Sequence, residues 1–62
     1  MTIRERILAE LEDGPMSCGA LAREVGLHAV LAREWLLLLI EDGDVVELSG
    51  FRYALAESGR AA

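Results

Sequence analysis

The side chains that could do chemistry in this chain are few. Its 62 residues include one Cys, Cys18, and one His, His28, with no second thiol or imidazole to complete a metal site. One Cys cannot hold a zinc or iron–sulfur centre, and no Ser-His-Asp set, Gly-rich phosphate loop or metal-ligand spacing occurs. We therefore expect no catalytic residue, no cofactor and no metal, and we expect that the chain is not an enzyme.

These polar residues also fit ordinary structural roles. Cys18 fits a small, half-buried residue in the first turn of a helix, and His28 fits a cap or a surface residue at the start of another. The acidic run 41–44 lacks the twelve-residue spacing of a calcium loop and fits a solvated turn. Binding, rather than catalysis, is the kind of function that remains open.

Charge narrows the choice of partner. The chain has six basic residues, all Arg, against eleven Asp plus Glu, which gives a net charge of −5. Nonspecific attraction to DNA comes from neutralising phosphates, so this balance disfavours double-stranded DNA as a partner. A local basic patch can outweigh the total, so DNA is not excluded.

Length and apolar content favour association with another protein surface. A chain this short buries only about 60% of the surface that its unfolded form exposes, and no disulfide framework stabilises it. Yet 53% of its residues are hydrophobic, more than one small core can hide. We expect a single domain over residues 1–62, with a core at about 3–55 and a flexible C-terminal tail, acting as a homo-oligomer or with a protein partner.

The sequence also indicates a compartment. A single Cys fits a cytoplasmic, reducing setting. The longest apolar run, 35–40, is too short to span a bilayer, and the N-terminus has no long apolar core, so we expect neither a membrane partner nor a signal peptide. The start Met and the 59–62 tail fit a complete small protein, and an accessory subunit that works beside a larger chain is the alternative.

Capping residues, apolar spacing and helix-stopping residues predict three helices over most of the chain. Thr2 and Glu5 form the capping-box pattern before a helix with apolar residues at helical spacing, which the Gly-Pro pair at 14–15 stops. Ser17 is the expected N-cap of a second helix about two turns long. A third helix should run from about residue 28 or 29 to 42.

Two short strands should follow the helices. Residues 45–48 and 51–55 are β-branched and aromatic and flank a two-residue Ser49-Gly50 turn, which predicts a hairpin. Alternate residues of the second strand should share one face, namely Phe51, Tyr53 and Leu55. The predicted fold class is therefore mainly α with a small β-hairpin (α+β).

The order helix, helix, helix, hairpin resembles the winged helix-turn-helix domains of small bacterial transcription regulators, over about residues 3–55. The residues that carry the resemblance are Leu21, Ala22, Arg23, Glu24, Val25, Gly26, Leu27, Ala32, Leu36, Leu39, Gly43, Val45, Tyr53, Ala54 and Leu55. The resemblance implies three helices plus a two-stranded wing, and DNA binding in transcription regulation, as a dimer.

In that family the third helix enters the major groove of DNA, and its early exposed positions reach base edges. Arg33 and His28 are the obvious donors here, because Arg can pair with guanine, whereas Ala and Val can only contact a thymine methyl. The expected DNA-binding residues are Arg23, His28, Ala29, Val30, Arg33 and Arg52, with Arg4 and Arg6 nearby. The opposing explanation is that the arginines pair with neighbouring acids such as Glu24 and Glu34.

The third helix is apolar on two sides, which favours a different function. One side fits the core, with Ala32, Leu36 and Leu39. The opposite side holds Val30, Glu34, Leu37 and Glu41, flanked by Leu31 and Leu38. A helix that is apolar all round is normally buried all round.

Two explanations of that second apolar side stay open. In one, Leu37 and Leu38 tuck under the first helix, the hairpin or the C-terminal tail. In the other, the chain is a protein–protein interaction or dimerisation module that keeps the winged-helix fold and does not bind DNA. Its contact residues would be Val30, Leu31, Glu34, Leu37 and Leu38.

Overall fold

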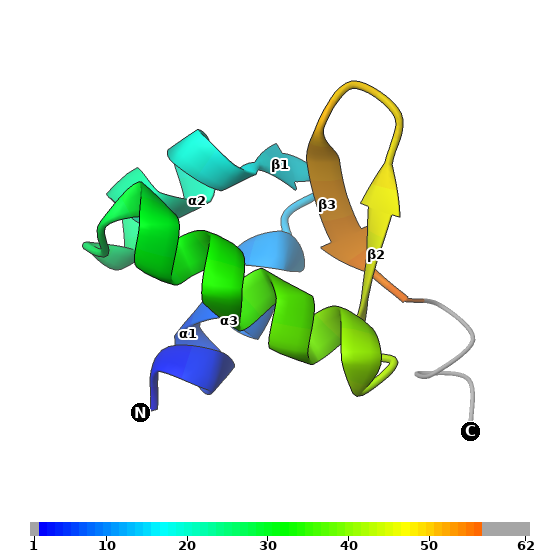
Figure 1. The fold of residues 1–62 in the computed structure, drawn as a ribbon, viewed down its shortest axis with the longest axis horizontal. Helices are drawn as coiled ribbons and strands as arrows, with labels where there is room; N and C mark the ends of the chain where they lie inside the picture. Colours follow the sequence, from blue (N-terminus) through cyan, green and yellow to red (C-terminus); the bar gives the residue numbers. More distant parts are fainter. Residues whose placement is uncertain (1, 57–62) are drawn as a thin grey trace.

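The computed structural model describes residues 2–56 and shows three helices beside a small sheet (Figure 1). The elements in chain order are α1 (Ile3–Leu11), β1 (Met16–Ser17), α2 (Cys18–Val25), α3 (Ala29–Glu41), β2 (Val45–Leu48) and β3 (Arg52–Leu55). The three predicted helices and both predicted strands are confirmed. The tail expected to be flexible lies outside the described residues.

Local side chains set the helix starts. The capping box at α1 is confirmed, because the Thr2 hydroxyl accepts a hydrogen bond from the Glu5 amide while the Glu5 carboxylate accepts one from the Thr2 amide. These hydrogen bonds, to the Thr2 backbone first and to its side chain second, lower the pKa of Glu5. The Ser17 hydroxyl caps α2 by accepting from the Ala20 amide, as predicted. His28 precedes α3 without making a side-chain cap.

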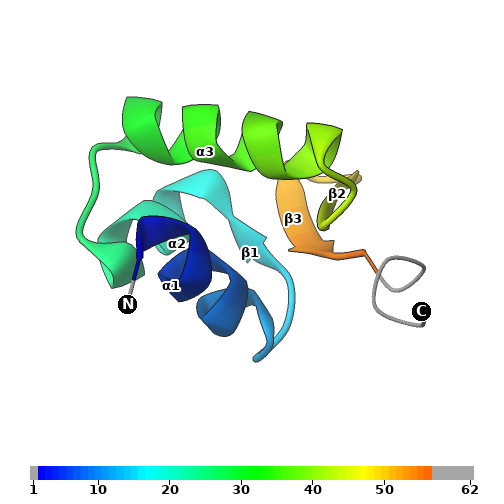
Figure 2. The same ribbon diagram turned by 90° about the horizontal axis from the view of Figure 1, so that it is seen from below.

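The core lies where the three helices meet the sheet. α3 forms the outermost layer on one side of the molecule, with α1, α2 and the sheet behind it (Figure 2). The buried residues that pack together are Ile7, Leu11, Leu21, Val25, Leu36, Leu39, Val45 and Tyr53. Each helix thus contributes two large apolar side chains to one cluster, and the hairpin closes its end.

The sheet has one strand more than the sequence predicts. β1 pairs antiparallel with β3, with Met16 opposite Tyr53, so the strand order is β1-β3-β2. The predicted two-stranded wing is confirmed as β2 and β3, whereas β1 was not predicted because a strand of two residues carries no detectable alternation. Because β1 directly precedes α2, its pairing with β3 holds the start of α2 beside the wing.

The turn of the wing also differs from the prediction. Leu48 pairs with Arg52, which leaves Ser49, Gly50 and Phe51 as a three-residue loop. Gly50 has φ 80° and Phe51 has φ 61°, so both lie in the left-handed region. Phe51 was expected to share a face with Tyr53 in the second strand, and this was wrong, because the longer loop takes it out of the strand.

An ion-pair cluster joins the start of α1 to the end of α3. Arg4 donates a hydrogen bond of 2.8 Å to Asp42 and also binds Asp44. The hydrogen bond to Asp42, with the nearby charges of both carboxylates, raises the pKa of Arg4. The acidic turn after α3 is therefore a contact point for α1, not a freely solvated segment.

Candidate interaction surface

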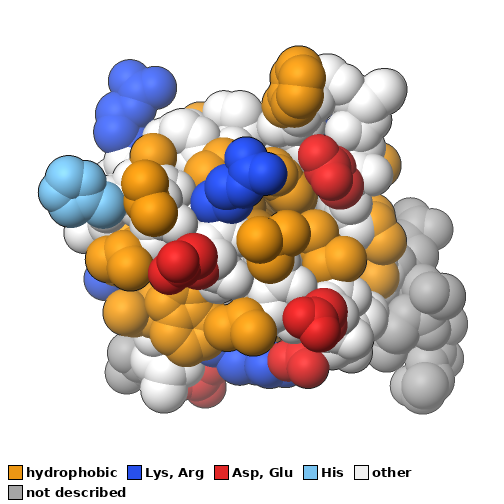
Figure 3. All heavy atoms as spheres, in the orientation of Figure 1, with side chains coloured by type: hydrophobic (Ala, Val, Ile, Leu, Met, Phe, Trp, Pro, Cys, Tyr) orange, Lys and Arg blue, Asp and Glu red, His pale blue; other side chains and the backbone are white. Residues whose placement is uncertain are grey.

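The outer side of α3 carries large apolar side chains that the rest of the described chain leaves uncovered. The inner side is buried through Ala32, Leu36 and Leu39. On the outer side, the exposed fractions are 69% for Val30, 47% for Leu31, 48% for Leu37 and 53% for Leu38. Figure 3 shows hydrophobic side chains gathered over α3, with single acidic and basic groups among them.

These exposures exclude part of one explanation drawn from the sequence. Leu37 and Leu38 are not tucked under α1 or the hairpin, because about half of each side chain reaches solvent. The prediction that α1 or the hairpin covers them was therefore wrong. The physical reason is that α3 is packed along one side only, and a 13-residue helix cannot turn both sides toward one small core. Cover by the C-terminal tail lies outside the described residues.

We call the exposed side of α3 the outer face. It is defined by Val30, Leu31, Arg33, Glu34, Leu37, Leu38 and Glu41. All seven side chains are exposed. The predicted contact residues Val30, Leu31, Glu34, Leu37 and Leu38 thus lie on one continuous helix surface, and contact with a partner stays a prediction.

The basic residues predicted to bind DNA are also exposed, but they come from three different elements. Arg23 lies in the last turn of α2, Arg33 lies on α3 and Arg52 begins β3. None of the three forms a salt bridge with an acid within residues 2–56. The predicted pairing with Glu24 and Glu34 is absent there, so these charges remain available to a ligand.

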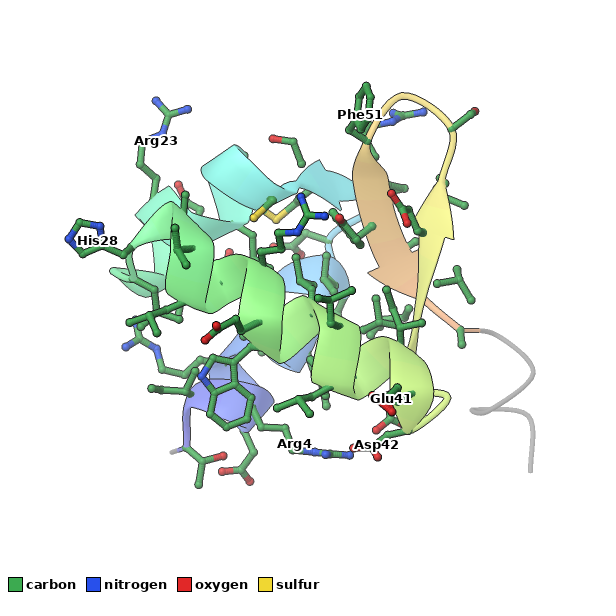
Figure 4. All side chains as sticks on the ribbon, viewed as in Figure 1. Arg4, Arg23, His28, Glu41, Asp42 and Phe51 are labelled. Atoms are coloured by element: carbon green, nitrogen blue, oxygen red, sulfur yellow. The ribbon has the colours of Figure 1, made fainter. Side chains whose placement is uncertain are left out.

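The predicted DNA-binding residues Arg23 and His28 lie at one end of α3, and Arg4 lies at the other (Figure 4). The expectation that Arg4 lies near the DNA-binding set was wrong, because its two ion pairs hold it at the acidic end. The outer face therefore carries Arg33 and Glu34 among apolar side chains in its first half, and only Glu41 among them in its second half.

The wing displays apolar residues that the sequence analysis did not select. Val46, Leu48 and Phe51 are exposed, and Phe51 at the wing tip reaches 81% (Figure 4). The predicted alternation placed Phe51 on the same face as Tyr53. The sequence gives little indication of the three-residue loop that removes Phe51 from the strand. A Gly followed by an aromatic at a predicted turn is the one available signal.

Other groups in the described part of the chain have structural roles or no ligand set. The Cys18 thiol donates to the Ala29 carbonyl at 3.5 Å, which ties the start of α2 to the start of α3. Residues 2–56 contain no cluster of three or more His, Cys, Asp or Glu side chains able to bind a metal ion. A shallow hollow of about 390 Å³ between α1 and α2 is lined partly by Glu10, Asp13 and Glu24.

Comparison with known proteins identifies the fold. No protein-family model matches the chain, and no curated protein matches it. HmgR of Pseudomonas aeruginosa aligns with 95% of this chain at 27% sequence identity and a TM-score of 0.82. N,N-8-amino-8-demethyl-D-riboflavin dimethyltransferase (RosA) from Streptomyces davawensis aligns with 92% at 22% identity and a TM-score of 0.72. The fold is winged-helix-like.

This winged-helix-like chain corresponds to only part of each similar structure. It spans 26% of the HmgR chain and 19% of the RosA chain. The likeness to RosA, at 22% identity, concerns the fold alone. None of the helices within residues 2–56 has the length and hydropathy that a membrane crossing requires.

Proposed function

We propose that this chain is a protein-interaction module that docks through the outer face of α3. The observation that carries the proposal is the exposure of Val30, Leu31, Leu37 and Leu38 on one helix. Four large apolar side chains on adjoining turns form a contact surface, because removing apolar area from water gives roughly 25 cal/mol per Å². The net charge of −5 supports a protein over a nucleic acid as the partner.

The winged-helix-like fold is compatible with a protein partner. One similar structure belongs to a dimethyltransferase, so a winged-helix-like region also occurs within an enzyme of small-molecule chemistry. A fold of this kind does not by itself imply DNA reading. What separates the functions is the chemistry of the exposed side of α3.

The proposal is tested by making the outer face polar without adding charge. Leu37→Gln with Leu38→Gln should leave the free energy of unfolding within about 1 kcal/mol, because both side chains are exposed. The fluorescence of an apolar dye such as anilinonaphthalene sulfonate should fall sharply. Val46→Gln with Leu48→Gln on the wing is the matched control and should lower dye fluorescence less. Unfolding of the α3 variant would place these leucines in the core and end the proposal.

A second candidate is DNA binding in transcription regulation, as a dimer, which is supported by the arginines that have no acid partner within residues 2–56. Arg33 would read the major groove together with His28, Ala29 and Val30, while Arg23 and Arg52 would bind phosphates. Two phosphate-neutralising groups predict a log–log salt slope of about −1.8. We therefore expect duplex binding only at low salt.

Titration of labelled duplex DNA tests this candidate. Binding that drops with Arg33→Ala, and again with Arg23→Ala, would favour DNA as the ligand. Arg4→Ala on α1 is the control, because its ion pairs hold Arg4 at the acidic end of α3, away from Arg23 and His28. Absence of binding at low salt would remove the candidate.

A further inference from the structure

We infer that the occupant of the outer face is a second copy of this chain, with the two α3 helices packed antiparallel about a two-fold axis through Leu37. The inference deepens the proposed function and rests on it. It names the partner and the register, and both follow from the order of charges along α3.

One ridge of the outer face is self-complementary. Arg33, Leu37 and Glu41 follow one another at intervals of four residues and are all exposed. Arg33 and Glu41 lie equally far from Leu37, about 6 Å along the helix on either side. An antiparallel second copy centred on Leu37 therefore sets each Arg33 opposite the other copy's Glu41, with Glu34 beside each pair, and each Leu37 opposite itself.

Two other arrangements of the α3 helices oppose like charges. A parallel pair would place Arg33 against Arg33 and Glu41 against Glu41, and an antiparallel pair centred on Glu34 would bring two carboxylates together. Like-charge juxtaposition suppresses wrong pairings. Arg33 has no acid partner within residues 2–56, so no described salt bridge has to break before it pairs across the axis.

The position of α3 allows a second helix to approach. Figure 2 shows α3 as the outer layer, with the other elements behind it. Leu38 and Val30 lie on the adjoining ridge, where they widen the apolar contact. A contact made mainly by one helix from each copy is at the small end of protein interfaces, so we expect a dimer that dissociates on dilution.

Disulfide trapping tests the register directly. In a Cys18→Ser background, Leu37→Cys should form a disulfide-linked dimer under mild oxidation. With helix axes about 8–10 Å apart, two facing Cα atoms come within the limit of about 7 Å for a disulfide. Val30→Cys is the matched control, since its two copies would lie about 20 Å apart along the helix and should remain unlinked. Equal trapping at both positions would overturn the register.

Charge exchange tests the same pairing in a different way. Arg33→Glu and Glu41→Arg should each weaken self-association about tenfold in sedimentation experiments, because each variant opposes like charges twice. An equimolar mixture of the two variants should associate again as a heterodimer, since both of its contacts are then attractive. Failure of the mixture to recover would overturn the inferred pairing.

These outcomes separate the inference from the proposed function. In one outcome, the Leu37→Gln, Leu38→Gln variant no longer self-associates, whereas the charge-exchange variants associate like the wild type. That outcome would support the outer face as an interaction surface and reject this register. A wild type that stays monomeric at millimolar concentration would reject the second copy. Unfolding of the leucine variant would reject the interaction surface itself.

Discussion

The two halves of α3 share one helix and one buried side but present different chemistry to solvent. The first half begins beside His28 and Arg23 and carries Arg33, whereas the second half carries Leu37, Leu38 and Glu41 and ends at the Arg4 ion pairs. A DNA-reading helix needs basic or polar groups at its exposed positions. Only the first half carries a basic group, Arg33, and the apolar second half is the ground on which we propose contact with protein.

The largest expected effect separates the inner side of α3 from its outer face. Leu36→Ala should lower the free energy of unfolding by about 2–5 kcal/mol, because it removes a fully buried side chain and leaves a cavity. Leu38→Ala should change it by less than about 1 kcal/mol at concentrations where the chain is monomeric. Chemical denaturation of both variants measures the difference. Equal losses would show that Leu38 is packed.

A smaller effect should distinguish the two ends of α3. Arg4→Ala removes the ion pairs to Asp42 and Asp44, which leaves those acids near the negative end of the helix dipole. We expect a modest fall in melting temperature and faster amide hydrogen exchange at residues 39–44, with residues 29–33 little changed. Arg6→Ala, at an exposed residue of the same helix, serves as the control. Uniform acceleration along α3 would contradict a local anchoring role for Arg4.

The smallest effect concerns the wing tip. Phe51 adopts φ 61°, which costs free energy for a residue other than glycine, and its ring is mostly exposed. Burial of the ring therefore does not offset the cost of this backbone conformation. Phe51→Asn should raise the free energy of unfolding by about 0.5 kcal/mol, since Asn tolerates the left-handed region better. Thermal unfolding of the two proteins gives the sign. A decrease would mean that the Phe51 ring packs against the domain.

Most of the fold was predictable because its signals are local. The Thr2–Glu5 box, the Ser17 cap and the spacing of Ile7, Leu21 and Leu36 each act within a few residues, and all are confirmed. Strand β1 and the three-residue wing loop were missed. Both depend on pairing between distant residues, such as Met16 with Tyr53, which a periodicity argument does not detect.

For the outer face of α3, the sequence predicted two alternatives, namely cover by another part of the chain or exposure to a partner. The sequence showed that α3 is apolar on two sides, but not which neighbours cover each side. Burial of Leu36 and exposure of Leu37 follow from how α1 and the hairpin dock, and that is a tertiary property. The ion pairs of Arg4 were likewise hidden, because they link residues about forty positions apart.

Sedimentation equilibrium of the wild type beside Leu37→Glu with Leu38→Glu tests the central claim most directly. If the outer face of α3 is an interaction surface for a second copy, the wild type will approach twice its monomer mass as concentration rises. The variant will stay monomeric with an almost unchanged unfolding midpoint. Equal association of both proteins, a wild type that stays monomeric throughout, or a variant that has lost its fold, would contradict the account.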